Sequence, residues 1–230
     1  MNTILHLFDI NTTLFTFIGY PMSYIEFFGT IFTVWCVWLT AKAKVLSWPV
    51  GIVGTVLYLA LFYQIQLYSD LFEQVYFLIS GFIGWWVWLH PKQGQKNDVA
   101  QLKVGRNTVK ENVLYVIGIA MGTVVLTYIT SNLHLWLPAY FTEPAALPFL
   151  DAFTTVMSFV AQWLLVRKKF ESWVLWILVD AIAIGLYWFK GVRFISLEYV
   201  LFLFIAIGGL INWVKIHQKE QYEQTPPARV

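Results

Sequence analysis

The sequence predicts an all-helical integral membrane protein, in which seven transmembrane helices form two parallel three-helix repeats joined by one linker helix, a 3+1+3 arrangement. Three observations predict this fold class. Of the 230 residues, 59% are hydrophobic and only 12% are charged, whereas a soluble domain has about 25% charged residues. Seven apolar runs are long enough to cross a bilayer. The chain also aligns with itself at a fixed offset.

The apolar runs are continuous, which favours helices over the strands of a membrane barrel, where apolar and polar residues alternate over about ten positions. A helix rises about 1.5 Å per residue and must cross about 30 Å of hydrocarbon, so a span needs roughly 17 to 25 residues. The predicted spans are residues 22–40, 48–66, 71–89, 112–130, 149–166, 171–190 and 194–214.

The segments outside the spans are assigned from their length and charge. Residues 1–20 are short and only partly apolar, and we expect them to lie along the membrane interface. Of the 15 Lys and Arg residues, all but Lys190 and Arg193 fall on one side of the predicted spans. The positive-inside rule makes that side cytoplasmic and the N-terminus external. A connector at 90–111 and a tail at 215–230 are then cytoplasmic, and a loop at 131–148 is external.

The self-alignment at an offset of 125 residues indicates an internal duplication. It pairs residues 26–88 with residues 151–213 without a gap and gives about 15 identities. The most informative are Ser-Trp at the start of each second helix, which pairs Trp48 with Trp173, and Glu73 with Glu198. We therefore expect repeats at 21–89 and 149–214, with the helix 112–130 as a linker. Such parallel repeats are typical of transporters, which bind their solute near the middle of the membrane between the repeats.

Catalysis has little support in the sequence. The chain has one cysteine, Cys36, and its four histidines lie outside the spans or at their ends without metal-ligand spacing. No intramembrane histidine is present to activate a serine. We therefore expect no enzyme, no cofactor and no metal, and the small positive charge gives no support for nucleic-acid binding.

Asp180 is the strongest candidate for contact with a solute. It lies midway along the sixth span, where an ionised carboxylate costs at least about 2.5 to 3.5 kcal/mol on the lowest scales. The aligned residue of the first repeat is Thr55, so duplication alone does not require an acid there. The alternative is a structural hydrogen bond that holds two helices together.

A stripe on the third span suits a flat ring. Gln74, Gly81, Trp85 and Trp88 recur at i, i+7, i+11 and i+14 on one helix face. Indole planes can stack on a heterocycle while the amide bonds to its polar edge. For Trp88 the alternative is an ordinary interfacial tryptophan.

Four further polar positions are candidates for the same path. Gln162, Tyr187 and Asn212 each replace an apolar or aromatic residue of the first repeat, which suggests solute contacts in one copy only. Glu198 is shared with the first repeat as Glu73, and both lie in the first turn of a helix, where an acid also complements the helix dipole.

Several motifs resemble those of the PnuC family of nicotinamide riboside transporters. In the first repeat these are Ser-Trp-Pro-Val-Gly at 47–51, Leu-Tyr-Ser-Asp at 67–70, Gln-Val-Tyr at 74–76 and Gly-Trp-Trp-Val-Trp at 84–88. In the second repeat they are the run 171–180, Tyr187 and Lys-Gly at 190–191. The likeness runs from about residue 24 to 215, and it adds Trp48 and Tyr76 to the candidate substrate contacts. Glu73-Gln74 departs from the Leu-Gln pair of many members.

The resemblance implies a seven-helix bundle related to the SWEET sugar transporters. It also implies facilitated diffusion of nicotinamide riboside across the bacterial inner membrane, with trapping by a separate cytoplasmic kinase. The expected partners are this small molecule, the lipid bilayer and further copies of the chain in a dimer or trimer. The alternatives are a carrier of another vitamin or nucleoside, such as thiamine, and a membrane receptor or scaffold that transports nothing.

Overall fold

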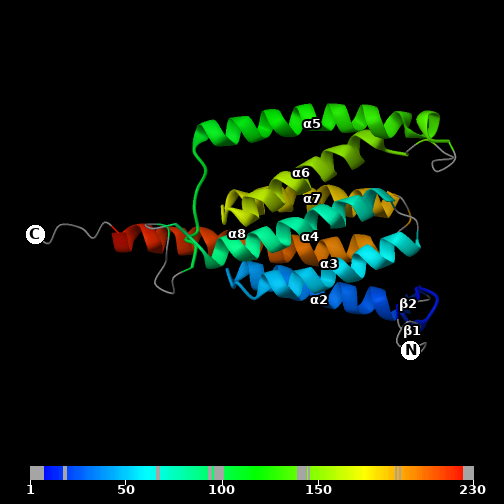
Figure 1. The fold of residues 1–230 in the computed structure, drawn as a ribbon, viewed down its shortest axis with the longest axis horizontal. Helices are drawn as coiled ribbons and strands as arrows, with labels where there is room; N and C mark the ends of the chain where they lie inside the picture. The colour runs from blue at the N-terminus through cyan, green and yellow to red at the C-terminus, as the bar shows by residue number, and fades with distance from the viewer. Residues whose placement is uncertain are drawn as a thin grey trace, which may run out of the picture. The chain divides into compact units, whose positions relative to one another are not determined.

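The computed structural model describes residues 8–17, 20–65, 68–92, 95, 101–138, 144, 146–189, 191 and 193–224. In this part of the chain, seven helices follow a two-stranded hairpin (Figure 1). The hairpin pairs β1 (Thr13–Phe17) with β2 (Tyr20–Ser23) in antiparallel fashion. The helices are α2 (Tyr24–Ala41), α3 (Ser47–Gln64), α4 (Tyr68–Leu89), α5 (Val109–Trp136), α6 (Pro148–Val166), α7 (Glu171–Phe189) and α8 (Arg193–Gln224).

Six of these helices, all except α4, are long and apolar enough to cross a membrane. Helix α4 has 22 residues, which gives a length of about 33 Å at about 1.5 Å per residue. That length also exceeds the roughly 30 Å of a hydrocarbon core. The all-helical membrane architecture predicted from the sequence is therefore present.

Five helices begin and end within three residues of the predicted spans, but α5 and α8 are longer. Helix α5 continues to Trp136, so the first part of the loop expected at 131–148 is helical, while residues 139–143 and 145 of that loop lie outside the described residues. Helix α8 continues to Gln224 and includes most of the expected tail. The extension of α5 at 131–136 mixes polar and apolar residues, and the one on α8 is rich in Lys, Gln and Glu, which favour helix without being apolar.

The hairpin was not expected from the sequence, which predicted only an interfacial segment at residues 1–20. The side-chain amide of Gln64, at the end of α3, forms hydrogen bonds to the segment just before β1 through both its nitrogen and its oxygen. Its Nε2 donates to the Phe8 carbonyl oxygen at 2.7 Å, and its Oε1 accepts from the Ile10 amide at 3.0 Å. Tyr20 donates to the Glu26 carboxylate. Burial and that hydrogen bond raise the pKa of the Tyr20 phenol.

The described residues form two compact units, one of residues 1–103 with 220–230 and one of residues 104–219. In the first unit, α3 packs against both α2 and α4. Small residues allow the close approach of α3 to α2: a Cβ built at Gly54 would lie 2.9 Å from the Thr33 hydroxyl oxygen. Helix α2 begins with a capping box, in which Ser23 and Glu26 satisfy each other's backbone amides.

In the second unit, α6 packs against both α5 and α7. Their shared core contains Ile119, Met157 and Val179. Helix α5 also begins with a capping box, formed by Thr108 and Glu111. Side chains of α8 contact α7 at three places: the rings of Tyr199 and Trp213 do so, and Ser196 Oγ donates to the Ile184 carbonyl oxygen at 2.8 Å.

The end of the connector is bound to the second unit by backbone and side-chain hydrogen bonds. Gly105 bonds to the turn between α6 and α7, donating to Lys168 and accepting from Phe170. The Asn107 amide donates to Glu171 Oε1 at 2.8 Å, and His217 Nδ1 donates to the Val104 carbonyl oxygen at 2.7 Å. Upstream, Leu102 bonds instead to the carbonyl oxygen of Trp88 at the end of α4. The chain thus passes from one unit to the other between Lys103 and Val104.

The turn between α2 and α3 and the turn between α6 and α7 have the same backbone structure at an offset of 125 residues. Ala43 and Lys168 both adopt a left-handed conformation, with φ of 54° and 53°. The hydrogen bonds that close the two turns also correspond, such as Lys44 N to Leu39 O at 3.0 Å and Lys169 N to Leu164 O at 2.9 Å. Lys44 and Lys169 are identical, whereas Ala43 stands where the second turn has Lys168, so the backbone is shared more closely than the side chains.

Candidate functional site

Trp48 and Trp88 pack edge to face in the first unit. Their ring centroids are 5.3 Å apart, with an interplanar angle of 89°, which is a favoured aromatic geometry. Trp48 lies over Gly84, where a Cβ would come within 2.2 Å of its ring. Both indoles are buried, and the Trp48 Nε1 atom has no hydrogen-bond partner. These two candidate residues therefore hold the start of α3 against the end of α4.

The same arrangement recurs in the second unit. Trp173 and Trp213 pack edge to face at 5.6 Å and 85°, and Trp173 lies over Gly209. The Trp173 Nε1 atom, like that of Trp48, is buried without a hydrogen-bond partner. Neither Trp173 nor Trp213 was among the candidate site residues, although the self-alignment pairs them with Trp48 and Trp88.

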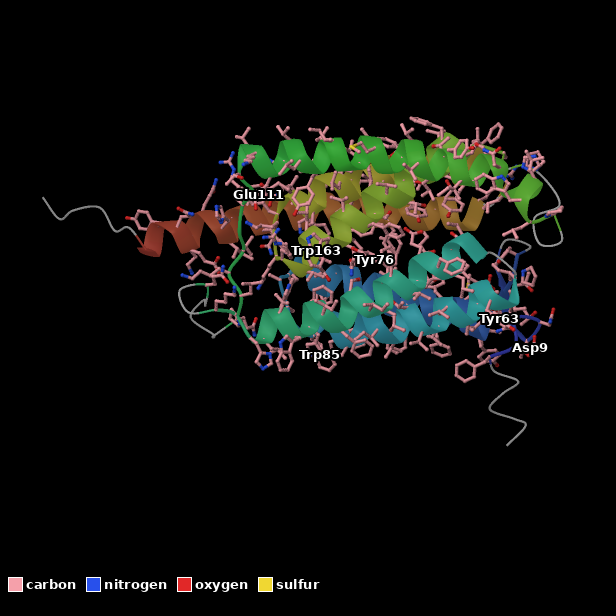
Figure 2. All side chains as sticks on the ribbon, turned by 45° about the horizontal axis from the view of Figure 1, so that its top comes forward. Asp9, Tyr63, Tyr76, Trp85, Glu111 and Trp163 are labelled. Atoms are coloured by element: carbon pink, nitrogen blue, oxygen red, sulfur yellow. The ribbon has the colours of Figure 1, made fainter. Side chains whose placement is uncertain are left out.

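The predicted stripe on α4 faces α3. A Cβ at Gly81 would lie 3.3 Å from Ile52 of α3, and Trp88 contacts Trp48. Gln74, seven residues before Gly81, lies on the same face and is half-buried. Trp85 is 36% exposed. Tyr76, labelled in Figure 2, is half-buried on α4. Its ring contacts that of Phe77.

Asp180 lies on the face of α7 that packs against α8. Trp173 and Tyr187, seven residues before and after it, contact Trp213 and Tyr199 of α8. Positions seven apart share a helix face, which places Asp180 between these two aromatic pairs. Its side chain is 3% exposed, and no hydrogen bond or ion pair to its carboxyl group is found in the described part of the chain.

Tyr187 stacks on Tyr199 with ring centroids 5.4 Å apart and an interplanar angle of 13°. Tyr199 was missed by the sequence reasoning, although the self-alignment at 125 residues pairs it with Gln74 and could have pointed to it. Glu198 and Asn212 are half-buried on α8, and Gln162 is buried on α6.

The candidate residues thus fall into two groups, each placed by its own unit. Trp48, Trp88 and the α4 residues belong to the first unit, and the other five belong to the second. In the first group Trp48 contacts Trp88, and in the second Asp180 and Tyr187 share a face of α7. Each group combines aromatic rings with amide, hydroxyl or carboxyl groups, which is the composition of a small-molecule site. Among the described residues, no group of three or more His, Cys, Asp or Glu side chains could hold a metal ion.

Comparison with known proteins gives one consistent result. The family model described as "Nicotinamide mononucleotide transporter" matches residues 23–215. The nicotinamide riboside transporter PnuC of Escherichia coli (strain K12) is 32% identical over 214 residues, which cover 85% of this chain and 87% of that protein. The riboflavin/roseoflavin transporter RibM of Streptomyces davaonensis is 23% identical over 204 residues, covering 89% and 91%. A crystal structure of the vitamin B3 transporter PnuC matches with a TM-score of 0.65 at 28% identity, covering 85% of this chain and 83% of that one.

Proposed function

Because this chain belongs to the PnuC family of membrane transporters, we propose that it carries nicotinamide riboside across the bacterial inner membrane. The family consists of transporters and not of enzymes, and the chain is a multi-pass membrane protein. The proposed mode of transport is facilitated diffusion, with a separate cytoplasmic kinase trapping the riboside as its phosphate.

The observation that carries this proposal is the buried Asp180 between two aromatic pairs in a member of this family. Nicotinamide riboside is a flat pyridinium cation that carries a ribose. Aromatic faces attract cations, and a carboxylate in a membrane requires a proton, a cation or a polar solute. Amides and tyrosine hydroxyls can bond to the ribose and to the carboxamide.

The charge of the spans favours the riboside over its 5′-phosphate. Lys and Arg are absent from α2, α3, α4, α6 and α7. The Lys and Arg residues of α5 and α8 lie towards the ends of these helices. A phosphate dianion would have no cation to pair with in the middle of the membrane, where an unpaired charge is costly. We therefore assign the riboside as substrate rather than the mononucleotide that the family description names.

We assign substrate contact to ten residues: Trp48, Gln74, Tyr76, Trp85, Trp88, Gln162, Asp180, Tyr187, Glu198 and Asn212. In this proposal the buried Trp48 and Trp88 also fix the start of α3 against the end of α4. The contacts of the second unit are those around Asp180 and Tyr187.

Alternating access through two parallel three-helix repeats is the proposed mechanism. Its support is the 125-residue correspondence of the turns at Ala43 and Lys168 and of the aromatic pairs at Trp48 and Trp173. Each repeat would move largely as a rigid body. The distribution of Lys and Arg supports an external N-terminus and a cytoplasmic C-terminus.

The test is uptake of labelled nicotinamide riboside into liposomes that contain the purified protein, with empty liposomes as control. We expect uptake that stops when internal and external concentrations are equal and that excess unlabelled riboside inhibits. Nicotinamide mononucleotide, riboflavin and thiamine serve as competitors. Uptake no faster than into empty liposomes would contradict transport and favour a receptor or scaffold.

The second candidate substrate is another vitamin, and the similarity to RibM favours riboflavin, which also has a flat heterocycle and a polar chain. Competition by riboflavin at lower concentration than the riboside would support this candidate. The assay therefore separates the two substrates.

A further inference from the structure

Four basic side chains gather around the first two turns of α5 in the second unit. They are Arg106 of the connector, Lys110 of α5, and Arg167 and Lys169 of the turn between α6 and α7. Lys169 Nζ donates to the Arg106 carbonyl oxygen at 2.7 Å, and Arg167 Nη1 donates to the Tyr115 hydroxyl of α5 at 3.2 Å. These bonds hold the turn between α6 and α7 to the connector and to α5 at one end of the helix.

Glu111 of α5 and Glu171 of α7 partly compensate these charges, and Glu171 Oε1 accepts from the Asn107 amide at 2.8 Å. Glu111 interacts electrostatically with both Lys169 and Arg167. Its Oε2 also accepts from the Thr108 amide at 2.7 Å and from the Thr108 hydroxyl at 3.0 Å, so it is occupied by the helix cap. Figure 2 shows Glu111 at the start of α5. Four positive charges and the two negative charges of Glu111 and Glu171 leave a net charge of +2.

The cluster borders an apolar surface. Val109, Val113 and Leu114 of α5 are 79%, 52% and 58% exposed, and exposed apolar side chains continue along this helix. Since α5 is one of the helices apolar enough to cross a membrane, this surface suits acyl chains. Arg106, Lys110 and Arg167 are exposed at its end. The guanidinium of Arg167 donates to Tyr115 through Nη1 and retains other N–H donors, in the fork that fits phosphate oxygens.

We propose that this basic cluster is a binding site for the phosphate headgroup of an anionic phospholipid whose acyl chains lie along α5. The occupant is a lipid rather than a soluble phosphate because the basic and apolar surfaces are continuous. The bound lipid joins the connector, α5 and the turn between α6 and α7 at the membrane surface. This site is independent of the transported substrate.

The first repeat supplies a matched control. The turn between α2 and α3 has the same backbone and carries Lys42 and Lys44 at the positions equivalent to Arg167 and Lys169. In this turn, Leu46 stands where the second unit has Glu171.

The test measures lipid binding to the purified full-length protein in a neutral detergent by native mass spectrometry. The probes are a phosphatidylglycerol and a phosphatidylcholine with the same acyl chains, and glycerol 3-phosphate as the soluble headgroup. Variants K110Q/R167Q and K42Q/K44Q remove two charges each, and R167K keeps the charge. Melting temperature in detergent without lipid shows that each variant is folded.

We expect phosphatidylglycerol to bind more tightly than phosphatidylcholine, and K110Q/R167Q to weaken this binding about 25-fold, a factor of about five for each charge. K42Q/K44Q should bind as the unchanged protein does, and R167K should retain most of the affinity. Equal loss in the two double variants, or no loss in K110Q/R167Q, would overturn the proposal. So would competition by glycerol 3-phosphate at the same concentration as the lipid, because the acyl chains would then contribute nothing.

Discussion

Replacing Gly84 by alanine is expected to destabilise the first unit through a single steric contact. A Cβ at this position would lie 2.2, 2.4 and 2.5 Å from Cη2, Cζ2 and Cζ3 of Trp48. Carbon atoms that are not bonded pack at about 3.5 to 4.0 Å. The indole would therefore have to move by more than about 1 Å. It cannot move freely, since it is buried and its other contact is the fully buried Trp88.

The expected cost follows from comparison with two glycines of α8. Overpacking a buried site costs about 1 to 3 kcal/mol. The higher helix propensity of alanine than of glycine offsets at most about 1 kcal/mol of this cost. An overlap of more than about 1 Å places this site at the upper end of the overpacking range, so Gly84→Ala should lower stability by about 2 kcal/mol. Gly209→Ala should cost less, because its Cβ would lie 2.8 Å from Trp173. Gly208→Ala, with nothing within 4 Å, should be neutral or slightly stabilising.

The assay is the melting temperature of each variant in detergent, with recovery of monodisperse protein as the control for folding. The order of melting temperatures should be Gly208→Ala, then Gly209→Ala, then Gly84→Ala as the lowest. A smaller residue at position 48 should reduce the penalty, so Trp48→Leu and Gly84→Ala should be non-additive. If Gly84→Ala had the same melting temperature as Gly208→Ala, the inferred fixed position of the Trp48 ring would be refuted.

The remaining predictions concern the site, the hairpin and a turn. Asp180→Asn should keep the yield of folded protein but lower riboside uptake at least tenfold, since a cation loses its partner; unchanged uptake in liposomes would remove Asp180 from the site. Gln64→Ala should increase hydrogen exchange of residues 8–23 without changing that of α6, because two hydrogen bonds worth about 1 kcal/mol each are lost; equal exchange would contradict this role. Ala43→Gly should raise stability by up to about 1 kcal/mol by relieving the left-handed backbone, and a lower melting temperature would show that chain entropy outweighs this relief.

The positions of the helices could be predicted from the sequence because apolar length fixes them. A span needs about 20 apolar residues whatever its neighbours are, and five helices fell within three residues of their predicted bounds. The ends of α5 and α8 were missed for the same reason, because neither continues the apolar run of its helix. Residues 215–224 form a helix by propensity, which a search for apolar runs does not detect.

The contacts that depend on distant residues could not be predicted. The segment leading into the hairpin is bound by Gln64, more than 50 positions away, and the connector is bound by Glu171 and His217. In the candidate site, the repeat alignment pointed to polar differences such as Asp180 and Thr55. It did not reveal that Tyr187 would stack on Tyr199, because stacking depends on the packing of α7 against α8.

The hydrogen bonds of the connector change partners between Lys103 and Val104, so a boundary between the two units falls at a single peptide bond. Residues before it bond back towards the end of α4, and residues after it bond to the turn between α6 and α7 and to α8. A gene divided at this codon would encode two polypeptides. The second would keep the hydrogen bonds of Val104, Gly105 and Asn107 to α7, α8 and the turn between α6 and α7. Co-expression of the two halves should reconstitute a transporter, and a reporter domain inserted at the same point would disturb the hydrogen bonds of neither half.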